Sequence, residues 1–379
     1  MRLDVIIPTR NRARLLAQAL ESLLLARVPD GLSVRIIVVN NGSTDTTSAM
    51  LEWMTARHRG RIVVIDERRR GKSRALNAGI AASDADLIGM IDDDEEVDGA
   101  WLEAIYCAFQ DPELDFIGGP YLPRWATPPP EWLPEEYLAV VGAVDSGNEP
   151  LEFGPDFPGI LKGGNAVVRR NVLQHVGPYV EHLGPSGSAR LLSCEDEEMY
   201  HRLLKAGARG RYLPWLVIHH HVCATRITPA YFRRWCFWRG VSRGLMDRTH
   251  PLRVAYLAGV PRFLYGRAAQ GLLNLGARAL GSNRPKKLAD ELSVWDLAGY
   301  FWGRHIYTLA RYSPVRSRRT TSATLPQVVV GSTLSTDTSV WKPSCYFDHR
   351  YGNEGADGDD HPACRLCVVE HRGTSAPTV

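Results

Sequence analysis

The chain has 379 residues, of which 44% are hydrophobic, enough for one large domain or two modest ones with a sizeable core. Its formal net charge of +3 is too small to indicate a nucleic-acid partner. It contains no apolar run of about 18 residues and no amino-terminal apolar segment, which argues against a spanning helix and a signal peptide. Seven scattered cysteines do not suggest a disulfide framework, so the expected location is the cytoplasm.

Short apolar runs alternate with amphipathic segments through the first 91 residues. The predicted strands are 3–8, 34–39, 61–66 and 86–91, and the predicted helices between them are 15–26, 46–58 and 71–82. This alternation predicts an α/β fold with a mostly parallel sheet and helices on both faces. Ligands of such sheets bind beyond the carboxyl ends of the strands, where Pro8, Asn40 and Asp92 stand.

The apolar run 87–91 ends in three aspartates and two glutamates. In an extended segment alternate side chains share a face, so Asp92 and Asp94 are expected to point the same way. Neighbouring carboxylates either share a proton or share a cation, and Mg²⁺ and Mn²⁺ take such oxygens together with substrate phosphates. A solvated acidic turn that caps the next helix accounts for the same residues equally well.

Four segments occur in an order that carries a family resemblance. They are Pro8-Thr9-Arg10-Asn11, Asn41-Gly42-Ser43-Thr44-Asp45, residues 72–79 and Asp92-Asp93-Asp94. Together they resemble the nucleotide half of a family 2 glycosyltransferase with the GT-A fold. The resemblance implies that Asp92 and Asp94 hold Mg²⁺ or Mn²⁺ on the diphosphate of a nucleotide-diphosphate sugar. It also implies donor contacts from Pro8, Thr9, Arg10, Asn11, Asn40, Asn41, Lys72, Asn77 and Asp93. Because the family usually has Asp where this chain has Asn40, the nucleotide base stays open.

The middle of the chain adds a helix at 100–110, a strand at 116–119 and a proline-rich stretch at 120–158, which is either a lid or an ordinary surface loop. The glycines that follow allow close backbone approach to a ligand. Gly163-Gly164-Asn165 resembles the family segment that lines the donor sugar.

Four consecutive acids, Glu195 to Glu198, open the next predicted helix, which runs to about residue 206. Acids in a first turn complement the helix dipole, and this is the simplest explanation. The family resemblance implies more: Asp196 is the general base that takes the proton of the acceptor hydroxyl, and Glu195 supports it.

A strand is predicted at 211–219, followed by the run His219-His220-His221. By resemblance His220 is a third metal ligand and Arg226 a phosphate contact, although a surface histidine run explains the motif nearly as well. Aromatic and basic helices are predicted at 231–245, 253–280 and 288–311. They suit either a membrane interface or ordinary packing on the catalytic core.

The expected organisation is a GT-A catalytic domain at 1–225, with a nucleotide-binding part at 1–119 and an acceptor part at 120–225, a helical extension at 226–312 and a disordered tail at 313–379. The resemblance implies an inverting, metal-dependent hexosyltransferase acting on a saccharide or lipid-linked acceptor in cell-surface polysaccharide or glycolipid synthesis. Such an enzyme would be cytoplasmic, with peripheral contact to the inner face of the plasma membrane.

Two other classes compete with this interpretation. A sugar nucleotidyltransferase would carry a glycine-rich basic loop after its first strand, which Pro8-Thr9-Arg10-Asn11 is not. A non-catalytic nucleotide-sugar-binding relative would not need the Glu195-Asp196 pair that this chain retains.

Overall fold

The structure is a computed structural model that describes residues 1–133, 135–186, 190–278 and 284–307. An eight-stranded sheet runs through it in the order β3-β2-β1-β4-β9-β6-β10-β8. Its strands are β1 (Arg2–Thr9), β2 (Ser33–Asn40), β3 (Ile62–Asp66), β4 (Leu87–Met90), β6 (Phe116–Gly118), β8 (Leu151–Glu152), β9 (Ala166–Arg169) and β10 (Gly210–Tyr212). The first four are mutually parallel, whereas β9 lies antiparallel between β4 and β6.

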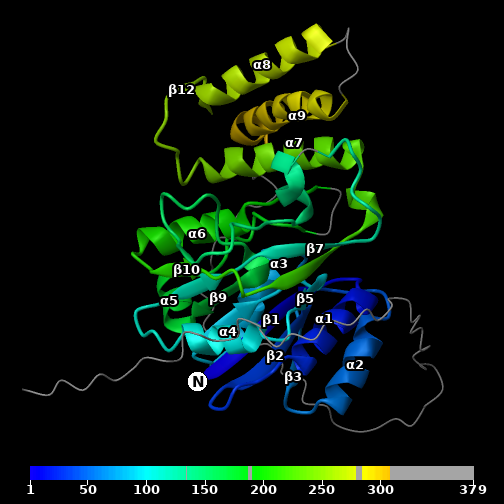
Figure 1. The fold of residues 1–379 in the computed structure, drawn as a ribbon, viewed down its shortest axis with the longest axis vertical. Coiled ribbons are helices and arrows are strands. Elements are labelled where there is room, and N and C mark those ends of the chain that lie inside the picture. The colour runs from blue at the N-terminus through cyan, green and yellow to red at the C-terminus, as the bar shows by residue number, and fades with distance from the viewer. Residues whose placement is uncertain (134, 187–189, 279–283, 308–379) are drawn as a thin grey trace, which may run out of the picture. The chain divides into compact units, whose positions relative to one another are not determined.

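Helices cover both faces of this sheet, as the alternation predicts (Figure 1). One face packs under α1 (Ala13–Leu25), α2 (Thr47–Arg57) and α4 (Trp101–Ala108). The other packs under α3 (Lys72–Ala82), α5 (Arg170–Val176) and α6 (Glu195–Lys205). Within β1 the side chains alternate accordingly, Leu3, Val5 and Ile7 facing the first layer and Ile6 the second. The predicted α/β class with a mostly parallel sheet is therefore confirmed.

A second, three-stranded sheet has the order β5-β11-β7, formed by β5 (Glu95–Val97), β11 (Ile218–Val222) and β7 (Tyr121–Trp125). The single strand predicted at 211–219 is wrong, because Pro214 interrupts it and a turn closes from Leu216 N to Leu213 O at 3.0 Å. The segment instead supplies β10 to the large sheet and β11 to the small one. The histidine run thus lies inside β11, where strand alternation buries His220 and leaves its two neighbours partly exposed.

The proline-rich stretch is less loop-like than expected. It contains β7, a 3₁₀ helix at Glu135–Val141 and β8. Two other short 3₁₀ helices, Gly163–Asn165 and Ala224–Arg226, lie next to the site described below.

Three long helices follow: α7 (Pro229–Met246), α8 (Arg262–Arg278) and α9 (Arg284–Phe301), which continues as a π-helix at Trp302–Ile306. The helix predicted at 253–280 begins late, because a small hairpin of β12 (Tyr256–Leu257) and β13 (Val260–Pro261) precedes it. The predicted tail at 313–379 lies outside the described residues. Within the described ranges no helix is long and apolar enough to cross a bilayer.

Helix α9 packs against both α7 and α8 (Figure 1). Its contact with α7 is made by glycines on both helices: a Cβ at Gly240 or Gly244 would collide with the α9 backbone, and one at Gly299 would collide with that of α7. Phe232 of α7 and Leu292 of α9 also join Val141 and Val222 in one buried cluster. The helices are therefore packed onto the rest of the described chain.

Candidate active site

A cavity of about 490 Å³ opens where β1, β2 and β4 end. Twelve of the sequence-predicted residues line it: Pro8, Thr9, Arg10, Asn41, Lys72, Asp92, Asp93, Asp94, Gly164, Asp196, His220 and Arg226. Residues from distant segments of the chain thus meet around one space.

The acidic segment after β4 is a turn. Strand β4 ends at Met90, and the turn closes through Glu95 N to Asp92 O at 3.2 Å. The Glu95 carboxylate also accepts from Asp92 N at 2.6 Å. The expectation that an extended backbone puts Asp92 and Asp94 on one face is therefore wrong in its premise, although both side chains line the cavity.

Each aspartate of the turn contacts at least one cation, and Asp93 and Asp94 share Arg12. Asp92 accepts from Lys72 Nζ at 2.7 Å. Arg12 Nη1 lies 2.9 Å from Asp93 Oδ1 and 2.6 Å from Asp94 Oδ2. Thr9 Oγ1 donates to Asp93 at 2.8 Å, and Arg226 Nη2 to Asp94 at 3.1 Å. These contacts neutralise part of the buried charge, as buried carboxylates require.

The charge that remains is visible in the pKa values of the turn. Burial, together with the charges of Asp92 and Asp94, holds the pKa of Glu95 well above its ordinary value. Burial also raises the pKa of Asp93 to about 6 against the opposing charge of Arg12. Burial would raise the pKa of Asp94 too, but His220, Arg12 and Arg226 outweigh it and hold that pKa well below its usual range. The carboxylates of the turn therefore carry more negative charge than the contacting cations neutralise.

His220 faces Asp94 from β11. Its Nε2 lies 3.7 Å from Asp94 Oδ2 and 3.2 Å from Arg226 Nη1. Its Nδ1 is buried against Gly142, where a Cβ would lie 2.6 Å from that nitrogen, and it has no hydrogen-bond partner among the described residues. The Nε2 of His220 therefore faces both the acidic turn and Arg226.

Helix α6 brings the second acidic cluster to the same cavity. It begins at Glu195 after Cys194, which has a left-handed φ of 72°. Asp196 Oδ1 is buried and has no hydrogen-bond partner in the part of the chain that the structure describes. Burial and then the charge of Asp196 raise the pKa of Glu195 to about 8, with Lys72 opposing from 3.9 Å.

Gly163 and Gly164 fit closely against these acids. A Cβ at Gly163 would collide with the Asp196 carboxylate, and one at Gly164 with the Glu95 carboxylate. The glycine pair therefore lets two carboxylates from distant segments pack against one backbone.

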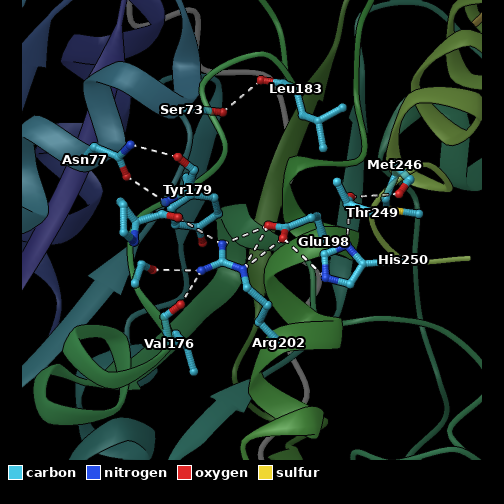
Figure 2. Close-up of polar contacts among 12 residues, drawn as sticks. Ser73, Asn77, Val176, Tyr179, Leu183, Glu198, Arg202, Met246, Thr249 and His250 are labelled. Carbon is cyan, nitrogen blue, oxygen red and sulfur yellow. Dashed lines mark hydrogen bonds and ion pairs between the residues drawn. The ribbon is translucent and has the colours of Figure 1, made fainter. Parts of the chain in front are cut away.

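The far face of α6 is held by a polar network (Figure 2). Arg202 donates to Glu198 at 2.8 Å and to the carbonyl of Gly177 at 3.0 Å, beyond the end of α5. His250 Nε2, which follows α7, lies 3.9 Å from Glu198 Oε1. This network fixes the helix that carries Asp196 to two other parts of the fold.

Four predicted asparagines hold loops in place. Asn77 exchanges two hydrogen bonds with the backbone of Tyr179, at 2.9 and 2.8 Å (Figure 2). Asn11 Oδ1 accepts from Thr44 N at 2.7 Å, and Asn40 Oδ1 from Ser43 N at 3.1 Å. Asn165 is fully buried behind the cavity. These four side chains shape the site from outside its lining.

Sequence reasoning missed several lining residues. The sequence offers a signal for two of them. Arg12 directly follows the first motif, and Glu95 directly follows the three aspartates. Lys162 directly precedes the glycine pair. Tyr231 and Trp235 were assigned only to an aromatic helix, and no local signal shows that this helix reaches the cavity.

Comparison with known proteins gives a family match and several relatives. Residues 4–177 match the model of the glycosyl transferase family 2. The chain is 26% identical to the glucosyl-dolichyl phosphate glucuronosyltransferase of Haloferax volcanii, over 62% of this chain and 71% of the relative. It is 25% identical to the succinoglycan biosynthesis protein ExoM of Rhizobium meliloti, over 68% of this chain and 79% of the relative.

Among solved structures, the mannosyltransferase PcManGT of Pyrobaculum calidifontis, in complex with GDP-Man and Mn²⁺, shares the fold with a TM-score of 0.54. It is 18% identical, and the match covers 81% of this chain and 88% of that one. The sheet with its flanking helices is thus the GT-A fold. Its matched segment, its relatives and its fold support a family 2 glycosyltransferase.

Proposed function

We propose that this enzyme moves a sugar from a nucleotide-diphosphate sugar to a hydroxyl of a saccharide or lipid-linked acceptor, with inversion at the anomeric carbon. The observation that carries the proposal is the pairing of two sites in one cavity. An acidic turn with cations lies at the strand ends, and Asp196, whose Oδ1 is buried with no hydrogen-bond partner among the described residues, lines the same space. An inverting transfer needs one carboxylate to accept the acceptor's proton while the diphosphate leaves on the other side.

The acidic turn fits a divalent cation in its donor chemistry. Carboxylate oxygens of Asp92 and Asp94 with the Nε2 of His220 form a donor set that Mn²⁺ or Mg²⁺ accepts. Within the described ranges no three acidic, histidine or cysteine side chains are gathered around one point, and Lys72, Arg12 and Arg226 contact the carboxylates of the turn. A divalent cation bound here would supply positive charge to the leaving diphosphate.

The protein's own groups account for the remaining steps. Arg12, Lys72 and Arg226 surround the place where the diphosphate would lie and add positive charge to it. Glu195, with its raised pKa, limits the negative charge beside Asp196 when it is protonated. Asp196 then takes the proton from the attacking hydroxyl.

A membrane-proximal acceptor is part of the proposal. Among the described residues, ten of the fourteen most exposed large hydrophobic side chains lie between residues 252 and 306. On α8, Leu272 and Leu273 are 57% and 69% exposed, and the exposed Arg262 and Arg267 lie on the same helix. Apolar and basic side chains together suit the interface of an anionic lipid surface.

A direct test combines donor binding with product analysis. The protein should bind one of UDP, GDP or dTDP with Mn²⁺ in calorimetry, and the affinity should fall when EDTA removes the cation. With the matching sugar donor, the product should carry the inverted anomeric configuration in its NMR spectrum. Equal affinity with and without the cation would contradict the metal assignment, and a retained configuration would contradict the role of Asp196.

A further inference from the structure

Lys162 is a cation of the cavity that the proposed transfer does not use. It directly precedes Gly163, and it lines the cavity on the side of Asp196. Among the described residues no hydrogen bond or ion pair holds its ammonium group. Burial lowers the pKa of Lys162, and the charge of Asp196 opposes that effect.

A second cation lies close enough to affect it. Arg239 of α7 stacks on Trp235, with its guanidinium carbon 5.5 Å from the ring centroid. The charge of Arg239 also depresses the pKa of Lys162. Trp235 itself lines the cavity, so Arg239 stacks on a ring that belongs to the cavity wall.

The diphosphate end of the cavity differs in its charge balance. There Lys72 lies 2.7 Å from Asp92, and Arg226 lies 3.1 Å from Asp94. Those cations are already paired, whereas within the described part of the chain Lys162 and Arg239 have no carboxylate within salt-bridge distance. A cation at a cavity wall that no carboxylate neutralises favours a bound anion.

We propose that Lys162 and Arg239 bind an anionic group, a phosphate or a carboxylate, that the acceptor carries near the hydroxyl to be glycosylated. The inference rests on the proposed function, because it places the acceptor on the Asp196 side of the cavity. The anion would lie against the two cations, and the Trp235 ring would pack on the apolar face of the acceptor sugar. A charge-assisted contact to a buried lysine is worth about 10- to 100-fold in affinity.

The test uses three probes that differ in charge: octyl β-D-glucoside, octyl β-D-glucuronide and octyl α-D-glucosyl phosphate. Each is titrated calorimetrically into the full-length protein saturated with its preferred nucleoside diphosphate and Mn²⁺, which blocks the other anion site. At least one anionic probe should bind about 10-fold or more tightly than the neutral glucoside. Preference for the glucuronide indicates a uronate acceptor, and preference for the phosphate indicates a phosphate-linked one.

The Lys162→Met variant should lose this preference, while Lys162→Arg should keep most of it. Lys205→Met, at an exposed lysine near the end of α6, is the matched control and should behave as the wild type. Nucleotide affinity is measured first in every variant. If the nucleotide does not bind, the proposed function fails. If it binds, equal affinity for all three probes, failure of both anionic probes to bind, or a preference that survives in Lys162→Met would overturn the acceptor assignment.

Discussion

Lys72 Nζ lies 3.9 Å from Glu195 Oε1 and so connects the acidic turn after β4 with the helix that carries Asp196. Although burial disfavours its charge, Asp92, Asp196 and Glu195 hold the pKa of Lys72 well above its ordinary value. One ammonium group is thus shared by the two acidic clusters of the site.

The raised pKa of Glu195 predicts a pH dependence of stability. The folded state holds a proton up to pH about 8, whereas the ordinary value for the unfolded chain is 4.5. The stabilising contribution is therefore fully present below pH 4.5 and is lost as the pH rises toward 8. Glu195→Gln should flatten the fall in melting temperature across this window. Glu113→Gln, at a side chain that is 73% exposed, should leave the profile unchanged. A steeper or unchanged profile in Glu195→Gln would refute the raised pKa.

Asp196→Asn should lower the transfer rate by about 10²- to 10⁴-fold, the usual loss when a general base is removed. The affinity for the donor should remain, because the donor is held at the acidic turn. Steady-state kinetics and calorimetry measure the two quantities. Glu197→Gln, in the same helical turn, is the control and should stay active. If both variants retain full activity, the acids of this turn only stabilise the helix through its dipole and take no part in catalysis.

Asp92→Asn should show the opposite pattern. Removing a carboxylate from the acidic turn weakens the complex of cation and nucleotide, so that the Mn²⁺ concentration needed for half-maximal nucleotide binding should rise. Melting temperature without ligand should change little, because the partly exposed Asp92 contacts Lys72 at the cavity wall. If the Mn²⁺ dependence of nucleotide binding is unchanged, the cation is bound by residues other than Asp92.

The glycine contact between α7 and α9 predicts a loss of stability in Gly244→Ala. The new Cβ would lie 2.5 Å from the Tyr300 carbonyl oxygen and 2.9 Å from Arg304 N, both backbone atoms. Overpacking of this kind typically costs about 1–3 kcal/mol. Gly266→Ala in α8 meets no atom within 4 Å and should be neutral or stabilising, by up to about 1 kcal/mol. Chemical denaturation of the two variants would decide, and equal stability would show that the helices are not closely packed.

Membrane contact through α8 is tested by flotation with vesicles that contain anionic lipid. The wild type should float at low salt and less at high salt. Leu272→Ser combined with Leu273→Ser should weaken binding, since a fully buried leucine contributes about 1.5–3 kcal/mol. Leu25→Ser, at a leucine of α1 that is 83% exposed, is the control. A wild type that stays in solution, or a control that loses as much binding, would argue against this surface.

The sequence predicted the sheet because its apolar runs and helical segments alternate locally. Strand-end reasoning placed Pro8, Asn40 and Asp92 at one edge, because parallel strands bring their carboxyl ends together. Pro8 and Asp92 line the cavity, whereas Asn40 holds the turn at Ser43 outside the lining. It failed where one apolar run serves two sheets: residues 210–222 contain a break at Pro214 that periodicity alone does not show.

The charge balance of the site was equally beyond local reasoning. Arg12 contacts two aspartates far along the chain, and Arg226 reaches Asp94 from after β11. Such pairings depend on the tertiary fold, and no spacing in the sequence encodes them. The three-dimensional arrangement was needed to distinguish paired cations from Lys162, for which no ion pair occurs in the described residues.

Asn165 accepts from Trp101 Nε1 at 2.9 Å and donates to the carbonyls of Leu216 at 2.6 Å and Pro120 at 3.2 Å. One amide therefore joins α4, the entry to β7 and the turn before β11 directly behind the glycine pair. A replacement at this position would displace the glycine backbone against which the Asp196 and Glu95 carboxylates pack. Its kinetic defects would therefore resemble those of a catalytic mutant. Loss of activity at Asn165 should therefore be judged by yield and folding before it is attributed to donor recognition.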